Sequence, residues 1–398
     1  MKTSRVTASA TRSMKRNTQE LGIWLFALAI GLAAVATPLA QAQTFTLLYN
    51  FDNNLGTAGG YPGSPTIDSS GNLYGTTATG GSEGYGTVWK LTPSGRFTVL
   101  HAFYYPTDGG APGGLHLASS GNFYGFATTG GPDCSGTLWM LTPSGTFTVL
   151  HCFTNSMTDG GTPTGLLLAS SGNLYGTTST GGAGHDGTVW ELTPSGTYTI
   201  LYSFSASTNA GFSPTGLIID SSGNLYGITT AGSADLHGSL YKLTPSGTLT
   251  MLHDFNQQTD GAPPTGVLLA PSGNFYGTSL GGGAHLFGTA WELTPSGTFT
   301  VLHNFYEPTD GADPSGLHLA PSGNFYGMSK VDGPHDYGTV WELTPSGTFT
   351  VLHAFPEYDG ATGAAGEPSG LLLAPSGNLY GTSFVTALYY GSLWELVP

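Results

Sequence analysis

Charged side chains are scarce in this chain of 398 residues: Asp, Glu, Lys and Arg together make up 8% of it, about a third of the usual share. Glycine and proline, at 63 and 25 residues, are enriched but fall short of the range typical of disordered chains. Hydrophobic residues at 39%, with 12% aromatics, are enough to fill a core. The composition therefore disfavours disorder, collagen and a helical bundle.

Basic residues are rarer still, with nine Lys and Arg against 24 Asp and Glu. Five of the nine lie within the first sixteen positions: Lys2, Arg5, Arg12, Lys15 and Arg16. Without residues 1–42, four basic and 23 acidic residues remain, which is a formal charge of −19. Such a surface repels a phosphate backbone, so nucleic acid is not an expected partner.

The first 42 residues have the order of a secretory signal peptide. A basic stretch ending at Arg16 is followed by an apolar run over 21–36 and by the small-x-small site at 40–42. A retained membrane anchor is the alternative, although the apolar run is short for a span. No later run is long enough to cross a bilayer. We expect cleavage near Ala42 and a mature protein, residues 43–398, that is secreted or periplasmic.

Three short blocks recur seven times along residues 43–398, at spacings of 50 to 54 residues. The block Gly-Asn-(Leu/Phe)-Tyr-Gly begins at Gly71, Gly121, Gly172, Gly223, Gly273, Gly323 and Gly377. The block Gly-(Thr/Ser)-x-(Trp/Tyr)-x-Leu begins at Gly86, Gly136, Gly187, Gly238, Gly288, Gly338 and Gly391. A third block, typified by Thr-Phe-Thr-Val-Leu-His-x-Phe, begins at Thr44, Arg96, Thr146, Thr197, Thr248, Thr298 and Thr348. A fixed period of this size indicates a repeat architecture.

Each repeat reads as four short β-strands separated by Gly, Pro, Ser, Asn and Asp clusters, without helical periodicity. Four strands every 50 residues predict an all-β fold: a single seven-bladed β-propeller domain with four antiparallel strands per blade. The mature chain opens with a lone fourth-type strand at 44–51 and closes with a third-type strand at 391–396. We expect this N-terminal strand to complete the last blade and close the ring. An open solenoid, the alternative, would need capping repeats.

Two connections in each repeat are tight and nearly constant, and two are longer and vary. The long ones are the stretch ending in Asp-Gly-x-x-Pro, as at 108–112, and the Gly-rich segment before each third strand. In an up-and-down blade both emerge on the same side, which we call the variable-loop face. Functional residues are expected there, because loops on a rigid scaffold carry most binding sites.

The repeated text Gly-Asn-Leu-Tyr-Gly-Thr-Thr, then Gly-Thr-Val-Trp-Glu-Leu-Thr-Pro-Ser-Gly-Thr, within 172–204 resembles the GloVer tandem repeat of secreted bacterial proteins. The resemblance covers almost all of residues 44–398. It implies an extracytoplasmic repeat protein without an assigned chemistry, whose relatives often carry C-terminal anchors. No such anchor is visible here, which favours release or periplasmic residence. The pattern is more loosely similar to NHL-type and virginiamycin-lyase-like propellers, which is an analogy of fold.

Histidine and acidic residues gather in the Gly-rich loops of four successive repeats and are the candidate catalytic or metal-binding residues: His185, Asp186, His237, His285, His335 and Asp336. If they converge over the channel mouth, they could hold a transition metal or perform acid–base chemistry. Their spacing along the chain does not fix their distance across the ring.

A second acidic series precedes Gly in the other long loop: Asp108, Asp159, Asp260, Asp310 and Asp359. Carboxylates in a ring could bind Ca²⁺, but Asp-Gly is also what a turn requires, and we favour turns. We predict no cofactor, and a bound Ca²⁺ or transition metal remains the open alternative.

Other histidines have structural explanations. Five share one register on the fourth strand, which favours an interblade role: His101, His151, His253, His303 and His353. His116 and His318 lie on the first strand, where they either line the channel or form core hydrogen bonds. The Trp series in the third strand is expected in the core between blades.

Aromatic residues beside polar ones on the variable-loop face suit sugar recognition, although they could equally pack the loops together. The candidate ligand-binding residues are Tyr104, Tyr105, Tyr306, Tyr337, Tyr389 and Asp235. The two cysteines, Cys134 and Cys152, lie almost symmetrically about a hairpin turn near 143–144, so we expect one local disulfide. Two buried thiols are the alternative.

These features favour a secreted, non-enzymatic binding propeller, expected to be monomeric, whose variable-loop face takes a glycan or an extracellular protein. The first alternative is a lyase or hydrolase that acts on a polysaccharide or cyclic ester with the His and Asp residues of the Gly-rich loops. The second is a structural envelope protein in which no loop side chain matters.

Overall fold

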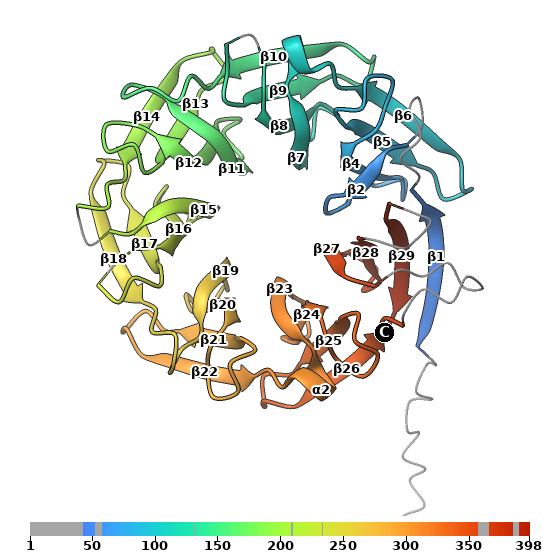
Figure 1. The fold of residues 1–398 in the computed structure, drawn as a ribbon, viewed down its shortest axis with the longest axis vertical. Helices are drawn as coiled ribbons and strands as arrows, with labels where there is room; N and C mark the ends of the chain where they lie inside the picture. The colour runs from blue at the N-terminus through green and yellow to red at the C-terminus, as the bar shows by residue number, and fades with distance from the viewer. Residues whose placement is uncertain are drawn as a thin grey trace, which may run out of the picture. The chain divides into compact units, whose positions relative to one another are not determined.

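The computed structural model describes residues 43–51, 58–131, 133–207, 210–232, 234–356, 366–384 and 390–398. The predicted signal peptide, Tyr389 and Asp359 lie outside these residues. Residues 43–398 form one compact unit, in which seven antiparallel sheets surround a common axis (Figure 1). The predicted seven-bladed propeller is confirmed.

In blades 1 to 6 the strands follow one another outward from the axis in chain order, and in blade 7 the outermost strand is β1. Blade 1 holds β2 (Gly60–Pro62), β3 (Thr66–Ile67), β4 (Leu73–Thr79), β5 (Thr87–Leu91) and β6 (Phe97–Ala102). Blade 2 holds β7 (Gly110–Leu117), β8 (Phe123–Thr129), β9 (Thr137–Leu141) and β10 (Phe147–Cys152). Blade 3 holds β11 (Gly160–Leu168), β12 (Leu174–Gly181), β13 (Thr188–Leu192) and β14 (Tyr198–Ser203). Blade 4 holds β15 (Phe212–Ile219), β16 (Leu225–Ala231), β17 (Ser239–Leu243) and β18 (Leu249–Asp254).

The remaining blades repeat this plan. Blade 5 holds β19 (Ala262–Leu269), β20 (Phe275–Gly281), β21 (Thr289–Leu293) and β22 (Phe299–Asn304). Blade 6 holds β23 (Ala312–Leu319), β24 (Phe325–Val331), β25 (Thr339–Leu343) and β26 (Phe349–Ala354). Blade 7 holds β27 (Pro368–Leu373), β28 (Leu379–Ser383), β29 (Ser392–Val397) and β1 (Thr44–Asn50). Two single-turn helices, α1 (Tyr105–Asp108) and α2 (Glu307–Asp310), lie in connections between blades.

Ring closure is made by the two ends of the described unit. Strand β1 pairs antiparallel with β29, from Thr44 opposite Val397 to Asn50 opposite Ser392. Figure 1 shows the two strands side by side at the outer rim. The expected completion of the last blade by the N-terminal strand is therefore confirmed, and the pairing leaves β29 without a free edge.

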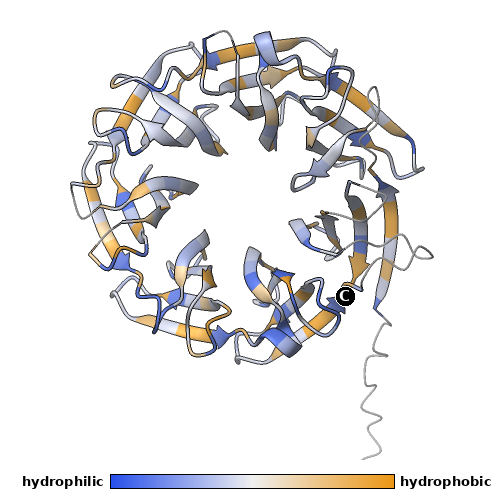
Figure 2. Ribbon diagram, in the orientation of Figure 1, coloured by the Kyte–Doolittle hydropathy of each residue, from blue (hydrophilic) through white to orange (hydrophobic). Residues whose placement is uncertain are grey.

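The core between blades is built on one large ring per blade. The third strands carry Trp89, Trp139, Trp190, Trp291, Trp341 and Trp394, with Tyr241 in blade 4, and all seven side chains are fully buried. Each ring lies over a glycine of the second strand, because a Cβ built at Gly176 would collide with the Trp190 ring. Figure 2 shows further hydrophobic residues along the outer strands, such as β6 and β10. The Trp series is thus in the core, as predicted.

Neighbouring blades are joined at the start of each first strand by a proline. A Cβ on Gly187 of blade 3 would lie 2.6 Å from Cδ of Pro214 in blade 4. The same contact closes the ring, since a Cβ on Gly391 would lie 2.5 Å from Pro62. Only glycine leaves room for this close approach, and its φ of 128° at Gly391 is one that other residues avoid.

At the outer rim, histidines on the fourth strands of several blades link the blade to the next one. His303 Nε2 lies 3.0 Å from the Asp310 carboxylate, and its ring stacks on Phe349 of the next blade at 3.9 Å between centroids. The same pairing joins His101 to Asp108, His151 to Asp159, and His253 to Asp260. The expected interblade role is confirmed for these four histidines and the turn role for their four aspartates, whereas His353 stacks on Phe45 of the next blade and Asp359 lies outside the described residues.

The inner histidines are hydrogen bonded across blade boundaries. His116 Nε2 lies 2.7 Å from the Leu166 carbonyl oxygen, and His318 Nε2 lies 2.9 Å from that of Leu371. Burial lowers the pKa of both imidazoles, although the bonds to the carbonyls act in the opposite direction. Each imidazole therefore makes a core hydrogen bond to a carbonyl oxygen in the first strand of the next blade, which is one of the two predicted roles.

Candidate functional site

The variable-loop face is formed by the connections between the second and third strands and between one blade and the next. The two kinds of loop contact each other within a blade: the Ala206 amide donates to the Asp186 carboxylate at 2.7 Å, and the Ala284 amide donates to Asn304 Oδ1 at 2.8 Å. In the Gly-rich loop, the His185 amide bonds the Gly182 carbonyl at 3.0 Å in a tight turn. His185 itself adopts a left-handed φ of 65° at the tip.

The structure distributes the candidate histidines over four blades and three turn positions. Counted back from the glycine that precedes the third strand, His237 is one residue away, His185 two, and His285 and His335 three. His185, His285 and His335 are exposed, and His285 packs against Tyr306 at 5.3 Å between ring centroids. These side chains therefore start from inequivalent backbone positions.

The acidic candidates are likewise engaged locally. Asp186 accepts the bond from Ala206, and Asp235 accepts one from the side-chain Nδ2 of Asn256 at 3.4 Å. Asp336 is exposed at the tip of its turn with a φ of 67°. Across the part of the chain that the structure describes, no group of three or more His, Cys, Asp or Glu side chains could hold a metal ion.

Exposed apolar side chains, in contrast, gather on this face. Nine large hydrophobic residues are exposed within the described ranges: Tyr61, Tyr85, Tyr104, Tyr105, Met157, Leu236, Leu286, Tyr306 and Tyr390. Every one of them lies in or beside the two kinds of variable loop. Tyr337, another candidate, is half-buried, and Tyr389 falls outside the described residues.

Several of these rings lie in pairs that join adjacent loops. Tyr85 and Tyr105 have ring centroids 5.2 Å apart, and Tyr61 and Tyr390 are 6.2 Å apart. The second pair spans the closure between blades 7 and 1. Tyr104 and Tyr105 flank the start of α1, and each exposes more than two fifths of its surface.

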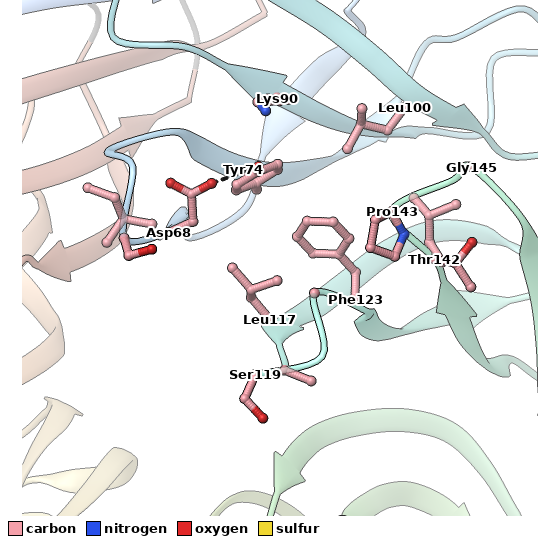
Figure 3. Close-up of a pocket in the computed structure, with 15 residues that line it drawn as sticks. Asp68, Tyr74, Lys90, Leu100, Leu117, Ser119, Phe123, Thr142, Pro143 and Gly145 are labelled. Atoms are coloured by element: carbon pink, nitrogen blue, oxygen red, sulfur yellow. Dashed lines mark hydrogen bonds between the residues drawn. The ribbon is translucent and has the colours of Figure 1, made fainter.

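The opposite face, formed by the tight turns and here called the hairpin face, carries a cleft that the sequence did not predict. It lies between blades 1 and 2 and has a volume of about 560 Å³. Leu100, Leu117 and Phe123 form apolar walls, and Lys90 lies beside Tyr74 at the rim (Figure 3). The Lys90 ammonium is 5.3 Å from the Tyr74 ring centroid.

A related cleft of about 530 Å³ lies between blades 5 and 6, with Glu292 in the place of Lys90. The two repeats differ at two linked positions: the first has Asp68 together with Lys90, and the fifth has Ala270 together with Glu292. The sequence could have revealed this exchange but not the open space between blades.

Cys134 and Cys152 are joined as a disulfide, with Cα atoms 5.5 Å apart. The bond ties the Gly-rich loop of blade 2 to the end of the outer strand β10. In blade 5 the equivalent strand end is Asn304, which holds its loop by a hydrogen bond instead. Different blades therefore use different chemistry to fix the same loop.

The fold and the loop face together define a seven-bladed propeller with an exposed, aromatic loop side. Residues 36–213 and 167–387 match the Gloeobacter/Verrucomicrobia repeat, and the chain belongs to this family. A comparison with curated proteins gives no significant match.

Solved structures share the fold at low sequence identity. A streptogramin B lyase is 16% identical, with a TM-score of 0.60, over 89% of this chain and 97% of the lyase. A catalytically inactive virginiamycin B lyase from Staphylococcus aureus with quinupristin is 14% identical, with a TM-score of 0.61, over 89% of this chain and 99% of the lyase.

The extracellular domain of a hybrid two-component system from B. thetaiotaomicron is 11% identical, with a TM-score of 0.58, over 86% of this chain and 39% of that protein. At these identities the likeness establishes the fold alone. In the described ranges, no helix has the length and apolar character needed to span a membrane.

Proposed function

We propose that this protein is an exported, non-enzymatic binding protein that takes a glycan on its variable-loop face. The observation that carries the proposal is the placement of all nine exposed large hydrophobic side chains on that face. A monomeric surface seldom gathers exposed apolar groups on one side unless they meet a ligand or partner. The order of basic, apolar and small residues in 1–42 supports export.

A glycan fits the chemistry of the exposed side chains. Six of the nine are tyrosines, whose faces stack on the C–H faces of sugars while their hydroxyls remain in water. An extracellular protein is the other ligand class that the loops could take. The enzyme alternative gains no support from the loop histidines, because they occupy three different turn positions.

Binding of the purified protein to a glycan array, together with affinity capture of extracellular proteins, tests this proposal. Tyr105→Ala should weaken binding at least about tenfold, which is about 1.4 kcal/mol, since truncation of a hot-spot tyrosine costs about 2 kcal/mol or more. Ser246→Ala, an exposed change on the hairpin face, is the matched control and should bind normally. Silence on the array would show that the glycan proposal is wrong, and a captured extracellular protein would then assign the face to the other ligand class.

A further inference from the structure

One position in the Gly-rich loop is equivalent in all seven blades and lies at the boundary with the next blade. We call its occupants the junction residues: Tyr85, Ser135, Asp186, His237, Phe287, Tyr337 and Tyr390. Each directly precedes the glycine that leads into the third strand. Their backbone register is shared, as shown by the isolated bridges of Tyr85 to Gly80 and of Tyr337 to Asp332.

The next blade holds the junction residues in place. The Ala111 amide of blade 2 donates to the Tyr85 carbonyl at 3.0 Å, and the Tyr61 amide of blade 1 donates to the Tyr390 carbonyl at 2.7 Å. The same bond joins Ser213 to Asp186 and Glu367 to Tyr337. Five of the seven junction residues are therefore anchored by the same backbone bond from the next blade: Tyr85, Ser135, Asp186, Tyr337 and Tyr390.

Aromatic side chains occupy four consecutive junctions. Blades 5, 6, 7 and 1 carry Phe287, Tyr337, Tyr390 and Tyr85, which together we call the aromatic arc. The other three blades carry Ser135, Asp186 and His237. The arc is continuous only because β1 and β29 close the ring and make blade 7 the neighbour of blade 1.

Two of the four arc rings are open to solvent, the other two also pack against the core between blades, and further exposed rings widen the arc. Tyr85 is 41% exposed and Tyr390 is 42% exposed, whereas Phe287 and Tyr337 are half-buried. Tyr105 lies beside Tyr85 at 5.2 Å, and Tyr61 lies beside Tyr390 at 6.2 Å. The exposed rings therefore extend across both boundaries of blade 1.

We propose that the aromatic arc binds a linear, uncharged polysaccharide chain, with rings of successive blades stacked on sugars spaced along the chain; this rests on the proposed function. One ring per blade along a line matches a repeating polymer. A protein partner, in contrast, is usually held by a compact central cluster of hot-spot residues. Polar groups in the same turns, such as Glu83, His335 and Asp336, are placed to meet sugar hydroxyls.

The charge of the face favours a neutral chain. Of the four basic residues beyond residue 42, Lys90, Arg96 and Lys242 belong to the third strands or the hairpin turns. The fourth, Lys330, lies near the end of β24. Burial raises the pKa of the nearby Asp313 carboxyl, the charge of Lys330 lowers it and the charge of Asp332 raises it. A polyanion would therefore meet an acidic surface with little compensation.

The test is affinity electrophoresis of the full protein through gels that contain xylan, mixed-linkage β-glucan, mannan, starch or polygalacturonate, followed by calorimetry with oligosaccharides of the retained polymer. We expect retention by at least one neutral polymer. We also expect a hexasaccharide to bind at least about tenfold more tightly than a disaccharide, because it contacts more rings.

Tyr85→Ala and Tyr390→Ala should each weaken neutral-glycan binding by about tenfold, and the double variant should abolish retention. Ser135→Ala, at the same turn position on blade 2, is the matched control and should stay within twofold. The changed side chains are exposed, so unchanged melting temperatures would show that the variants fold.

The outcomes separate this inference from the function on which it rests. Equal affinity for short and long neutral oligosaccharides, or binding that persists in the Tyr85→Ala/Tyr390→Ala double variant, would show that the arc is not the binding site. The proposal of glycan binding itself would still stand. Tighter retention by polygalacturonate would overturn the neutral class. Loss of a captured protein in the arc variants, without any glycan binding, would assign the arc to a protein partner and overturn the glycan proposal as well.

Discussion

Near the hairpin face of most blades, one asparagine and one tyrosine side chain donate hydrogen bonds to the same carboxylate. That carboxylate belongs either to an Asp just after the first strand or to a Glu in the third strand. In blade 1, Asp68 accepts bonds from Asn72 Nδ2 at 2.8 Å and from the Tyr74 hydroxyl at 3.0 Å. In blade 6, the third-strand residue Glu342 accepts the same two bonds at 2.6 and 2.9 Å. In blade 6 the residue that corresponds to Asp68 is Ala320. In the blades that have Asp after the first strand, the residue that corresponds to Glu342 is Lys.

This exchange predicts a compensating pair of substitutions in blade 1. Asp68→Ala should destabilise the protein by about 1–2 kcal/mol, because Asn72 and Tyr74 lose their acceptor. Adding Lys90→Glu should restore most of that loss, since the site then matches blade 6. Urea unfolding measures both effects.

The exposed change Ser120→Ala serves as control and should leave the free energy of unfolding within about 0.5 kcal/mol. A double variant less stable than Asp68→Ala alone would contradict the exchange.

At the scale of the element, the fourth strand and the loop that follows it act as one unit. Where the strand carries His, the loop carries Asp, as in His303 with Asp310; where it carries Tyr202 or Tyr49, the loop has Ala210 or Ala58. Burial raises the pKa of the Asp310 carboxyl, but bonds from His303, Thr309 and the Tyr306 amide outweigh it and leave that pKa below its ordinary value. These hydrogen bonds hold the end of the outer strand to the loop that leads into the next blade, and we call each such His–Asp pair a latch.

Buried histidines on the fourth strands, together with the hydrogen-bonded aspartates, make the protein sensitive to acid. Burial lowers the pKa of His101, and it lowers that of His353 to about 4, with a smaller contribution from the charge of His335. Between pH 6.5 and 4 the unfolded chain binds more protons at these sites, so stability falls as the pH falls. Below pH 4, protonation of carboxylates such as Asp310, whose folded pKa is lowered, removes further stability.

We expect thermal melts at pH 7 and pH 4.5 to differ in stability by an amount on the order of 1–3 kcal/mol. His353→Phe should reduce this difference, because the ring that stacks on Phe45 is kept and the titrating group is removed. His285→Phe, at an exposed loop position, should leave the difference unchanged. Equal stability at both pH values would contradict the latch as a source of acid sensitivity.

At the scale of the whole molecule, stability depends on a ring whose last sheet is made from both ends of the described unit. Phe45 of β1 packs against Trp394 of β29 at 5.8 Å and against Phe355 of blade 6 at the same distance. Phe51, just after β1, is fully buried beside Trp89 of blade 1. The N-terminal strand therefore contacts blades on both sides of the closure.

We expect deletion of residues 43–51 to cost more stability than any single substitution considered above, because it exposes the edge of β29 and removes Phe45 and Phe51 from the core. A circular permutant that links residue 398 to residue 43 and opens the tight turn between Ser195 and Gly196 should fold. Size-exclusion chromatography and thermal melts distinguish the two. A deletion variant as stable as the parent would contradict closure as a source of stability.

The strand pattern, the seven repeats, the closure by the first strand and the burial of the Trp series can all be read from the amino-acid sequence. All four follow from local periodicity and from the point in the repeat at which the mature chain begins, which are properties of the chain read in order. The pairing of His303 with Asp310 is also visible in the sequence, because His and Asp are replaced together by Tyr and Ala.

Which loop residues are neighbours depends on the packing of the blades and on the closure of the ring. His185, His237, His285 and His335 looked like one group along the chain, yet they leave the ring from different turn positions on four blades. Tyr390 and Tyr85, near opposite ends of the chain, become successive members of one arc. The cleft beside Lys90 also exists only between packed blades. Distances across a ring depend on how blades pack and close, and a repeat of about 50 residues carries no record of them.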